Sequence, residues 1–185
     1  MRVVKEVMAM RNITIVRHSD IQPEAIQEFF SGYIYRKTNS DNFIEEFSHS
    51  YPDFQQWFKG IVYKGLQENK HERGNHERDI LFLMDKISCG NCIAGFAIIK
   101  NTIDEKKICS FRISKPYRGE GLGRILMKNC MQELYTNAPL MTMPENCRDE
   151  FEKLLDEFHF KLTQILSDYY TKGVTEYVFN GHLKK

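Results

Sequence analysis

The chain has 185 residues, of which 42% are hydrophobic and 28% charged, a balance typical of a globular domain and not of a disordered or fibrous chain. Its 26 Lys and Arg residues almost balance its 25 Asp and Glu residues, so it lacks the basic excess that favours binding to nucleic acid or to an anionic membrane. The number of cysteines is odd, five, and the N-terminus has no secretory pattern, so the sequence predicts a cytoplasmic protein. No apolar run approaches the roughly 20 residues of a membrane span.

The N-terminal half is predicted to contain one strand followed by two helices. Residues 1–11 are expected to be a flexible leader, and residues 12–185 a single domain. Alternating apolar residues predict a strand over 12–17, and Pro23 at a first-turn position predicts a helix over 23–32. Apolar residues spaced three and four apart predict a second helix over 51–66.

The C-terminal half is predicted to be richer in strands. After a polar loop at 71–78, short β-rich pieces at 80–86, 92–100 and 107–114, each bounded by turn residues, predict an antiparallel meander. A helix after Gly123, a strand over 140–143, a helix over 145–158 and strands over 160–170 and 175–182 follow. This order predicts an α+β fold, a mixed and mostly antiparallel twisted sheet flanked by helices.

Three glycines lie within five residues, between a predicted strand and a predicted helix: Gly119, Gly121 and Gly123. Glycines at such a turn let the backbone approach a ligand, and the free N–H groups of the following helix favour an anion. The spacing fits neither the G-x-G-x-x-G dinucleotide pattern nor the Walker A loop. The segment therefore indicates a phosphate site of another kind.

The segment Arg118-Gly119-Glu120-Gly121-Leu122-Gly123 resembles the [RQ]-x-x-G-x-[GA] motif with which the GNAT superfamily of N-acetyltransferases binds acetyl-coenzyme A. The apolar-x-apolar strand end at 111–113, the Pro-aromatic pair at 116–117 and the helix opening at 124–127 are similar to the family pattern in the same register. The expected order of elements also resembles this superfamily along nearly the whole chain.

This resemblance implies transfer of an acetyl group from acetyl-coenzyme A to a primary amine by direct attack, without a metal. Backbone groups of Phe111, Arg112 and Ile113 would pair with the pantetheine arm. The pyrophosphate would be held by the segment that follows: Arg118, Gly119, Glu120, Gly121, Leu122, Gly123 and Arg124.

The resemblance leaves the acceptor and the oligomeric state open. A small-molecule amine, a protein amine and an aminoacyl-tRNA are all compatible with it, although the near-zero net charge disfavours RNA. Homodimers are common in the superfamily, so a homodimer is expected as one form.

The family's acid and base positions are not matched. Lys107 stands where members often carry a glutamate, Leu155 where they carry a tyrosine and His159 where they carry a glycine. No catalytic residue is therefore assigned, and a non-catalytic acyl-coenzyme A-binding sensor or scaffold remains the alternative.

Several residues are weaker candidates for the missing roles. Asn146 lies about two residues out of register with an asparagine of the family's later helix. Strict alternation would place Cys109 on one strand face with Lys107, Phe111 and Ile113, as the one thiol there that could hold a water. The candidates for a general acid are Tyr169, Tyr170 and Tyr177.

Two further groups have competing interpretations. The region from Phe29 to Tyr63 is rich in aromatic residues that either line an amine pocket, with Glu45, Glu46 or Asp53 attracting the cation, or pack the helices on the sheet. A zinc site would combine a CxxC pair, Cys89 and Cys92, with two histidines of the polar loop, His71 and His76. The spacing of these residues is a weak signal, so no metal is predicted.

Overall fold

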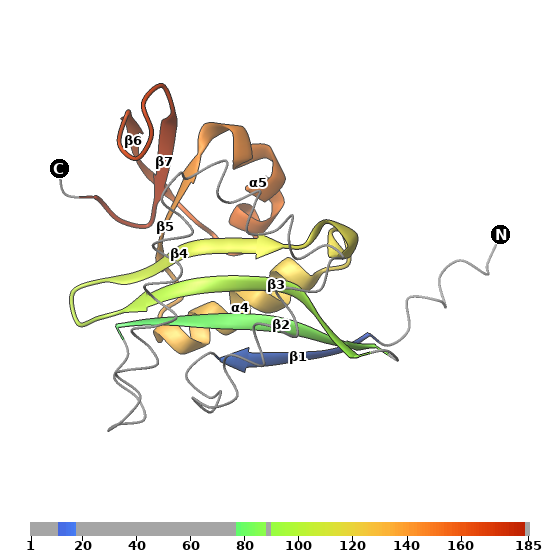
Figure 1. Cartoon of the computed structure of the whole chain (residues 1–185). Coiled ribbons are helices and arrows are strands. Elements are labelled where there is room, and N and C mark those ends of the chain that lie inside the picture. The colour runs from blue at the N-terminus through green and yellow to red at the C-terminus, as the bar shows by residue number, and fades with distance from the viewer. Residues whose placement is uncertain (1–10, 18–76, 88–89, 184–185) are drawn as a thin grey trace.

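The computed structural model describes residues 11–17, 77–87 and 90–183 (Figure 1). The described strands are β1 (Asn12–Arg17), β2 (Arg78–Ile87), β3 (Gly90–Asn101), β4 (Lys106–Ile113), β5 (Leu140–Pro144), β6 (Leu162–Ser167) and β7 (Thr175–Phe179). The described helices are α4 (Leu122–Leu134) and α5 (Arg148–Glu157), with 3-10 turns η2 (Lys115–Tyr117) and η3 (Glu145–Cys147).

The seven strands form one sheet in the order β1-β2-β3-β4-β5-β7-β6. Neighbouring strands are antiparallel except β4 and β5, which run parallel. The predicted α+β fold with a mixed, mostly antiparallel sheet is confirmed, including the meander β2-β3-β4.

Element boundaries differ from the prediction mainly near the C-terminus. The helix expected over 145–158 begins with η3 and becomes α-helical only at Arg148. β6 ends at Ser167 because Asp168 takes a positive φ of 58° and its carboxylate accepts the Gly173 N–H, which closes a loop before β7. β7 ends at Phe179, before Asn180 with a positive φ of 60°. The helices predicted over 23–32 and 51–66 lie outside the described residues.

One face of the sheet carries the main hydrophobic core beneath α4 and α5. Helix α4 contributes fully buried side chains at Leu126, Met127 and Leu134, spaced so that they share one side of the helix. Leu155 of α5 joins the same cluster, as do Tyr177 and Phe179 of β7. The core therefore holds both helices on the same face, on either side of the junction between β4 and β5.

A β-bulge in β4 changes the expected alternation of its side chains. The pairing with β3 shifts between Ile98 and Ile99, opposite Cys109, and an extra residue at such a point reverses the phase of the strand. As a result, Ile108 and Phe111, three positions apart, both lie in the core. The prediction that one face carries Lys107, Cys109, Phe111 and Ile113 is therefore wrong.

Candidate active site

The sheet opens between its two parallel strands. β4 and β5 pair only at Lys107 with Leu140 and at Ile108 with Met141, and Figure 1 shows β5 and β7 running steeply away from β4. From Ser110 to Ile113, β4 forms a ladder with β3 alone. This stretch therefore presents a strand edge to the opening, and strand edges pair readily with an added extended chain.

A cavity of about 870 Å³ occupies this opening. It is bounded by β4, the glycine-rich loop, the first turn of α4, β5, η3, one side of α5 and the segment before β7. Of the ten residues predicted to bind the cofactor, nine line it: Phe111, Arg112, Ile113, Arg118, Gly119, Gly121, Leu122, Gly123 and Arg124.

The glycine-rich loop has the backbone geometry of an anion cradle. Gly119 and Gly121 have φ values of 79° and 77°, in the left-handed region that glycine occupies at little cost. Gly121 is the N-cap of α4, and within the described part of the chain no acceptor is bonded to the backbone N–H groups from Gly119 to Gly123. These N–H groups and the positive end of the helix dipole favour a phosphate at this edge of the cavity.

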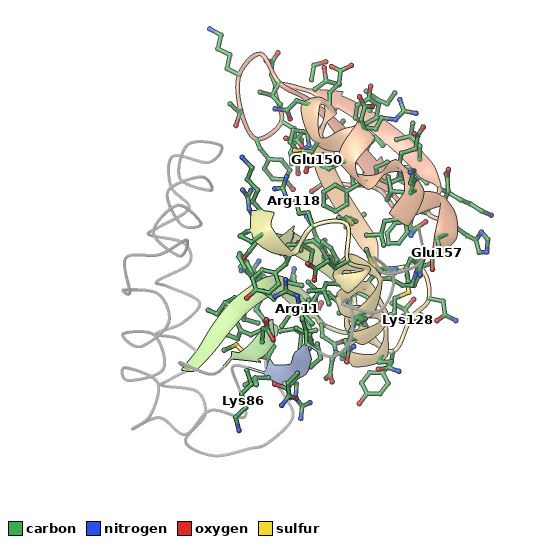
Figure 2. All side chains as sticks on the ribbon, turned by 90° about the vertical axis from the view of Figure 1, so that its right-hand side faces the viewer. Arg11, Lys86, Arg118, Lys128, Glu150 and Glu157 are labelled. Atoms are coloured by element: carbon green, nitrogen blue, oxygen red, sulfur yellow. The ribbon has the colours of Figure 1, made fainter. Side chains whose placement is uncertain are left out.

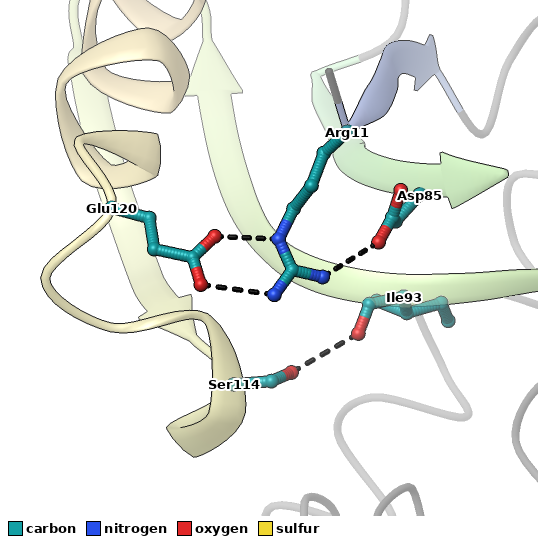
Figure 3. A network of polar contacts seen from close by, with 5 residues as sticks. All are labelled: Arg11, Asp85, Ile93, Ser114 and Glu120. Atoms are coloured by element: carbon teal, nitrogen blue, oxygen red, sulfur yellow. Dashed lines mark hydrogen bonds and ion pairs between the residues drawn. The ribbon is translucent and has the colours of Figure 1, made fainter. Parts of the chain in front are cut away.

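Glu120, the tenth predicted residue, is turned away from the cavity by Arg11 (Figure 3). The Arg11 guanidinium donates to both Glu120 carboxylate oxygens, with Nε 2.6 Å from Oε2 and Nη2 2.9 Å from Oε1. Its third donor, Nη1, lies 2.9 Å from Oδ2 of the buried Asp85 on β2. This network ties the glycine loop to β2, the first strand of the meander, and keeps the Glu120 charge off the cradle.

The two arginines of the motif reach across the opening to α5. Arg118 Nε donates to the Ile113 carbonyl at 3.2 Å, and its Nη1 lies 3.3 Å from Glu150 Oε1. Arg118 and Glu150 are labelled in Figure 2. Arg124 Nε lies 2.5 Å from Glu157 Oε1. Both arginines therefore already have carboxylate partners, and their charge toward a pyrophosphate is reduced.

Two residues at the unmatched family positions, Leu155 and His159, have places in the fold that explain them. Leu155 is buried in the core, and His159 has a φ of 56°, a backbone conformation that suits the glycine of the family pattern. The Tyr177 hydroxyl donates to Glu145 Oε1 at 3.2 Å. None of the three candidate tyrosines lines the cavity, whereas Asn146 does.

Cys109 also lines the cavity. Burial is the main cause of a raised pKa of its thiol, which opposes ionisation. The cysteine can therefore offer a weak S–H donor at neutral pH but not a thiolate base.

Sequence reasoning missed several ionisable residues of the cavity, namely Cys147, Glu150, Lys153, Glu157 and Glu176. Of these, Glu176 on β7 is the buried carboxylate. Its side chain lines the cavity and is only 1% exposed, and its Oε2 accepts no hydrogen bond from any residue within the described ranges. Burial raises the pKa of this carboxyl to about 7. The signal that could have found it is a lone acidic residue inside the apolar and aromatic strand 175–179.

Some sequence predictions fall outside the described part of the chain. These are the acceptor-side candidates Glu45, Glu46 and Asp53, the zinc candidates Cys89, His71 and His76, and the side chain of Cys92. Within the described ranges, no three His, Cys, Asp or Glu side chains form a group that could hold a metal. No described helix is long and apolar enough to cross a membrane.

Seven strands in this order, flanked by α4 and α5 and opened between β4 and β5, form the fold of the GNAT acyltransferases. The model of the Acetyltransferase (GNAT) family matches residues 33–139, more than half of the chain, and the chain belongs to this family. No curated protein shows significant sequence similarity to it.

Several solved structures share the fold at low sequence identity. A protein from Desulfovibrio desulfuricans assigned to the GNAT family is 12% identical with a TM-score of 0.64, over 90% of this chain and 96% of that one. The ribosomal-protein-S18-alanine N-acetyltransferase of Escherichia coli is 15% identical with a TM-score of 0.59, over 94% and 97% of the two chains. NAA60 of Arabidopsis thaliana, solved with a bisubstrate analogue, is 12% identical with a TM-score of 0.52, over 90% and 97%.

Proposed function

We propose that this protein transfers an acetyl group from acetyl-coenzyme A to a primary amine. The observation that carries the proposal is the coincidence of two separate features in one cavity. One is the free edge of β4 beyond the pair Ile108–Met141, and the other is the anion cradle at the start of α4. A long ligand with an amide-bearing arm at one end and a diphosphate at the other fits both features.

The pantetheine arm would lie against β4 as an extra strand. Its amide groups would pair with main-chain groups of Phe111, Arg112 and Ile113. This pairing would hold the thioester near the bulge at Cys109, where β4 and β5 begin to separate. Positioning of this kind makes the attack of the amine on the thioester effectively unimolecular and so lowers its barrier.

The diphosphate would lie against the glycine loop, where the main-chain N–H groups from Gly119 to Gly123 have no acceptor among the described residues. The chain supplies these donors with the loop already in its left-handed conformation at Gly119 and Gly121, so little rearrangement is needed on binding. Arg118 and Arg124 would exchange part of their contacts with Glu150 and Glu157 for contacts with the phosphates.

The acceptor belongs to the class of primary amines. The name of one structural neighbour specifies an alanine of ribosomal protein S18 as its acceptor, which supports including peptide N-termini in an acceptor screen. Small-molecule amines belong in the same screen, because nothing in the described part of the cavity selects between them.

Calorimetric titration with acetyl-coenzyme A, free coenzyme A and S-acetylpantetheine tests the cofactor assignment. We expect micromolar binding of the first two and much weaker binding of the third, which lacks the diphosphate. Equal binding of all three would refute the anion cradle, and binding of none would refute the proposal. Release of free thiol in the presence of one amine would exclude a non-catalytic binding protein.

A further inference from the structure

The Glu176 carboxylate is an unusual group for a folded protein to retain. Most buried polar atoms have a hydrogen-bond partner, because losing contact with water is costly for a charged group. Glu176 is 1% exposed, yet its Oε2 has no partner among the described residues. Lys107 lies close enough to affect its charge, but the Lys107 ammonium is bonded to the Tyr170 hydroxyl at 3.2 Å instead.

The position of Glu176 in β7 turns it away from the helices. Tyr177 and Phe179 alternate into the core beneath α4 and α5, whereas Glu176 and Val178 lie on the opposite face. On that face, Glu176 is paired with Pro144 of β5. The carboxylate is therefore separated by the sheet from the side on which the two helices pack.

The cavity passes through the opening and reaches both faces of the sheet. Its lining includes Phe151 and Leu154, which pack with the core on the helix side, and Glu176 on the opposite side. Cys109 and Ser110, at the bulge where the strands separate, line the same cavity. A thioester held along β4 at this bulge would thus lie in the same cavity that Glu176 lines.

We propose that Glu176 is the catalytic base of the acetyl transfer, accepting the proton of the amine substrate on the sheet face opposite α4 and α5. This inference rests on the proposed function.

The step balances without any further reactant. The Glu176 carboxylate takes one proton from the substrate ammonium, and the free amine attacks the thioester carbonyl carbon to form the C–N bond. Collapse of the tetrahedral intermediate breaks the C–S bond, and the thiolate takes the second proton of the nitrogen. The amide and free coenzyme A leave, and Glu176 returns its proton to solvent.

The groups around Glu176 suit a base that works near neutral pH. Burial disfavours its ionised form, and Lys107 offsets this in part, so the pKa of the carboxyl is raised to about 7. A base with such a value is half ionised at neutral pH and holds the abstracted proton well. The Tyr170 hydroxyl lies beside Lys107. The other charged side chains and thiols that line the cavity are Cys109, Arg112, Arg118, Arg124, Cys147, Glu150, Lys153 and Glu157.

The test compares Glu176→Gln with Glu133→Gln. Glu133 is a half-buried residue of α4 that pairs with Arg17 at 3.1 Å and is not among the residues lining the cavity, so it controls for loss of a carboxylate elsewhere. Each variant is titrated with acetyl-coenzyme A. Free-thiol release is then followed with butylamine, Nα-acetyl-lysine amide and an Ala-Gly dipeptide between pH 5.5 and pH 9.

We expect Glu176→Gln to bind acetyl-coenzyme A within twofold of wild type and to lose about 100-fold or more in turnover, while Glu133→Gln keeps wild-type turnover. For wild type, kcat/KM should rise tenfold per pH unit up to about pH 7 and then level off. The pH at which it levels off should be the same for amines of different basicity. That inflection should vanish in Glu176→Gln. A residue with a structural role alone would leave the inflection in place.

Two results would overturn the inference while the cofactor assignment stands. One is a Glu176→Gln variant with wild-type turnover and an unchanged pH profile. The other is a wild-type protein that binds acetyl-coenzyme A and acetylates none of the three amines. Failure of wild type to bind acetyl-coenzyme A would refute the proposed function, and the inference with it.

Discussion

Aspartate and asparagine at position 121 separate the charge of a side chain from its bulk at the phosphate cradle. Gly121 has a φ of 77°, and a Cβ built there meets no heavy atom within 4 Å. Either substitution should therefore cost only the left-handed conformation, about 1 kcal/mol of unfolding free energy. The Gly121→Asp variant should be at least as stable to unfolding as the Gly121→Asn variant, because a negative charge is favourable at the N-terminus of α4.

The affinity for acetyl-coenzyme A should distinguish the two variants. Two charges about 4 Å apart repel by about 1 kcal/mol in bulk water and by about 4 kcal/mol near a protein surface. Gly121→Asp should therefore bind roughly 5-fold to several hundred-fold more weakly than Gly121→Asn. This difference in affinity between the two variants should become smaller in 1 M salt, where the screening length is about 3 Å.

Calorimetric titration at low and at high salt measures this gap, and urea denaturation shows that both variants are folded. Equal affinities of the aspartate and asparagine variants at low salt would refute the placement of the diphosphate at the α4 N-terminus. A gap that does not change with salt would show that the loss is not electrostatic and would refute the stated cause.

Three further substitutions probe the network, the core and the buried carboxylate. Arg11→Gln leaves the buried Asp85 without its ion-pair partner and should lower the unfolding free energy by about 1–2 kcal/mol, measured by urea denaturation; an unchanged midpoint would contradict this role. Leu126→Ala empties a fully buried site on α4 and should cost about 2–5 kcal/mol, again by urea denaturation, and a loss below 1 kcal/mol would show that the core beneath α4 is loose. The pKa of Glu176 is raised to about 7 from 4.5, so the folded state holds a proton that the unfolded state has lost between these pH values, and wild type should lose up to about 3 kcal/mol of stability as pH rises through this window. Glu176→Gln should lack this loss, and parallel stability profiles of wild type and variant from pH 4.5 to pH 8 would contradict the buried ionisation.

Features encoded by adjacent residues could be predicted from the sequence. The meander β2-β3-β4 follows from three short apolar runs separated by turn residues, and the phosphate cradle follows from three glycines between a strand and a helix. Both depend on backbone preferences that act within a few residues. Most of the residues predicted for the cofactor accordingly line the cavity.

Features that depend on strand pairing or on distant contacts could not be predicted. The bulge at Cys109 is a mismatch between β4 and its partner β3, which the β4 sequence alone does not reveal. The contact of Arg11 with Glu120 joins positions 109 apart in the chain. Glu176 became a candidate only once the opening between β4 and β5 showed that a residue on β7 lines the same cavity as the β4 edge.

The two-pair junction between β4 and β5 also has a mechanical consequence. Backbone hydrogen bonds connect β1 to β4 as one ribbon and β5 to β7 as another, and only Lys107–Leu140 and Ile108–Met141 join the two. Local opening in proteins follows such weak seams. Amide hydrogens of β5, β6 and β7 should therefore exchange with solvent as a separate group, faster than those of β1 to β4. A ligand that contacts both groups of strands along the junction should slow this exchange, because it opposes their separation.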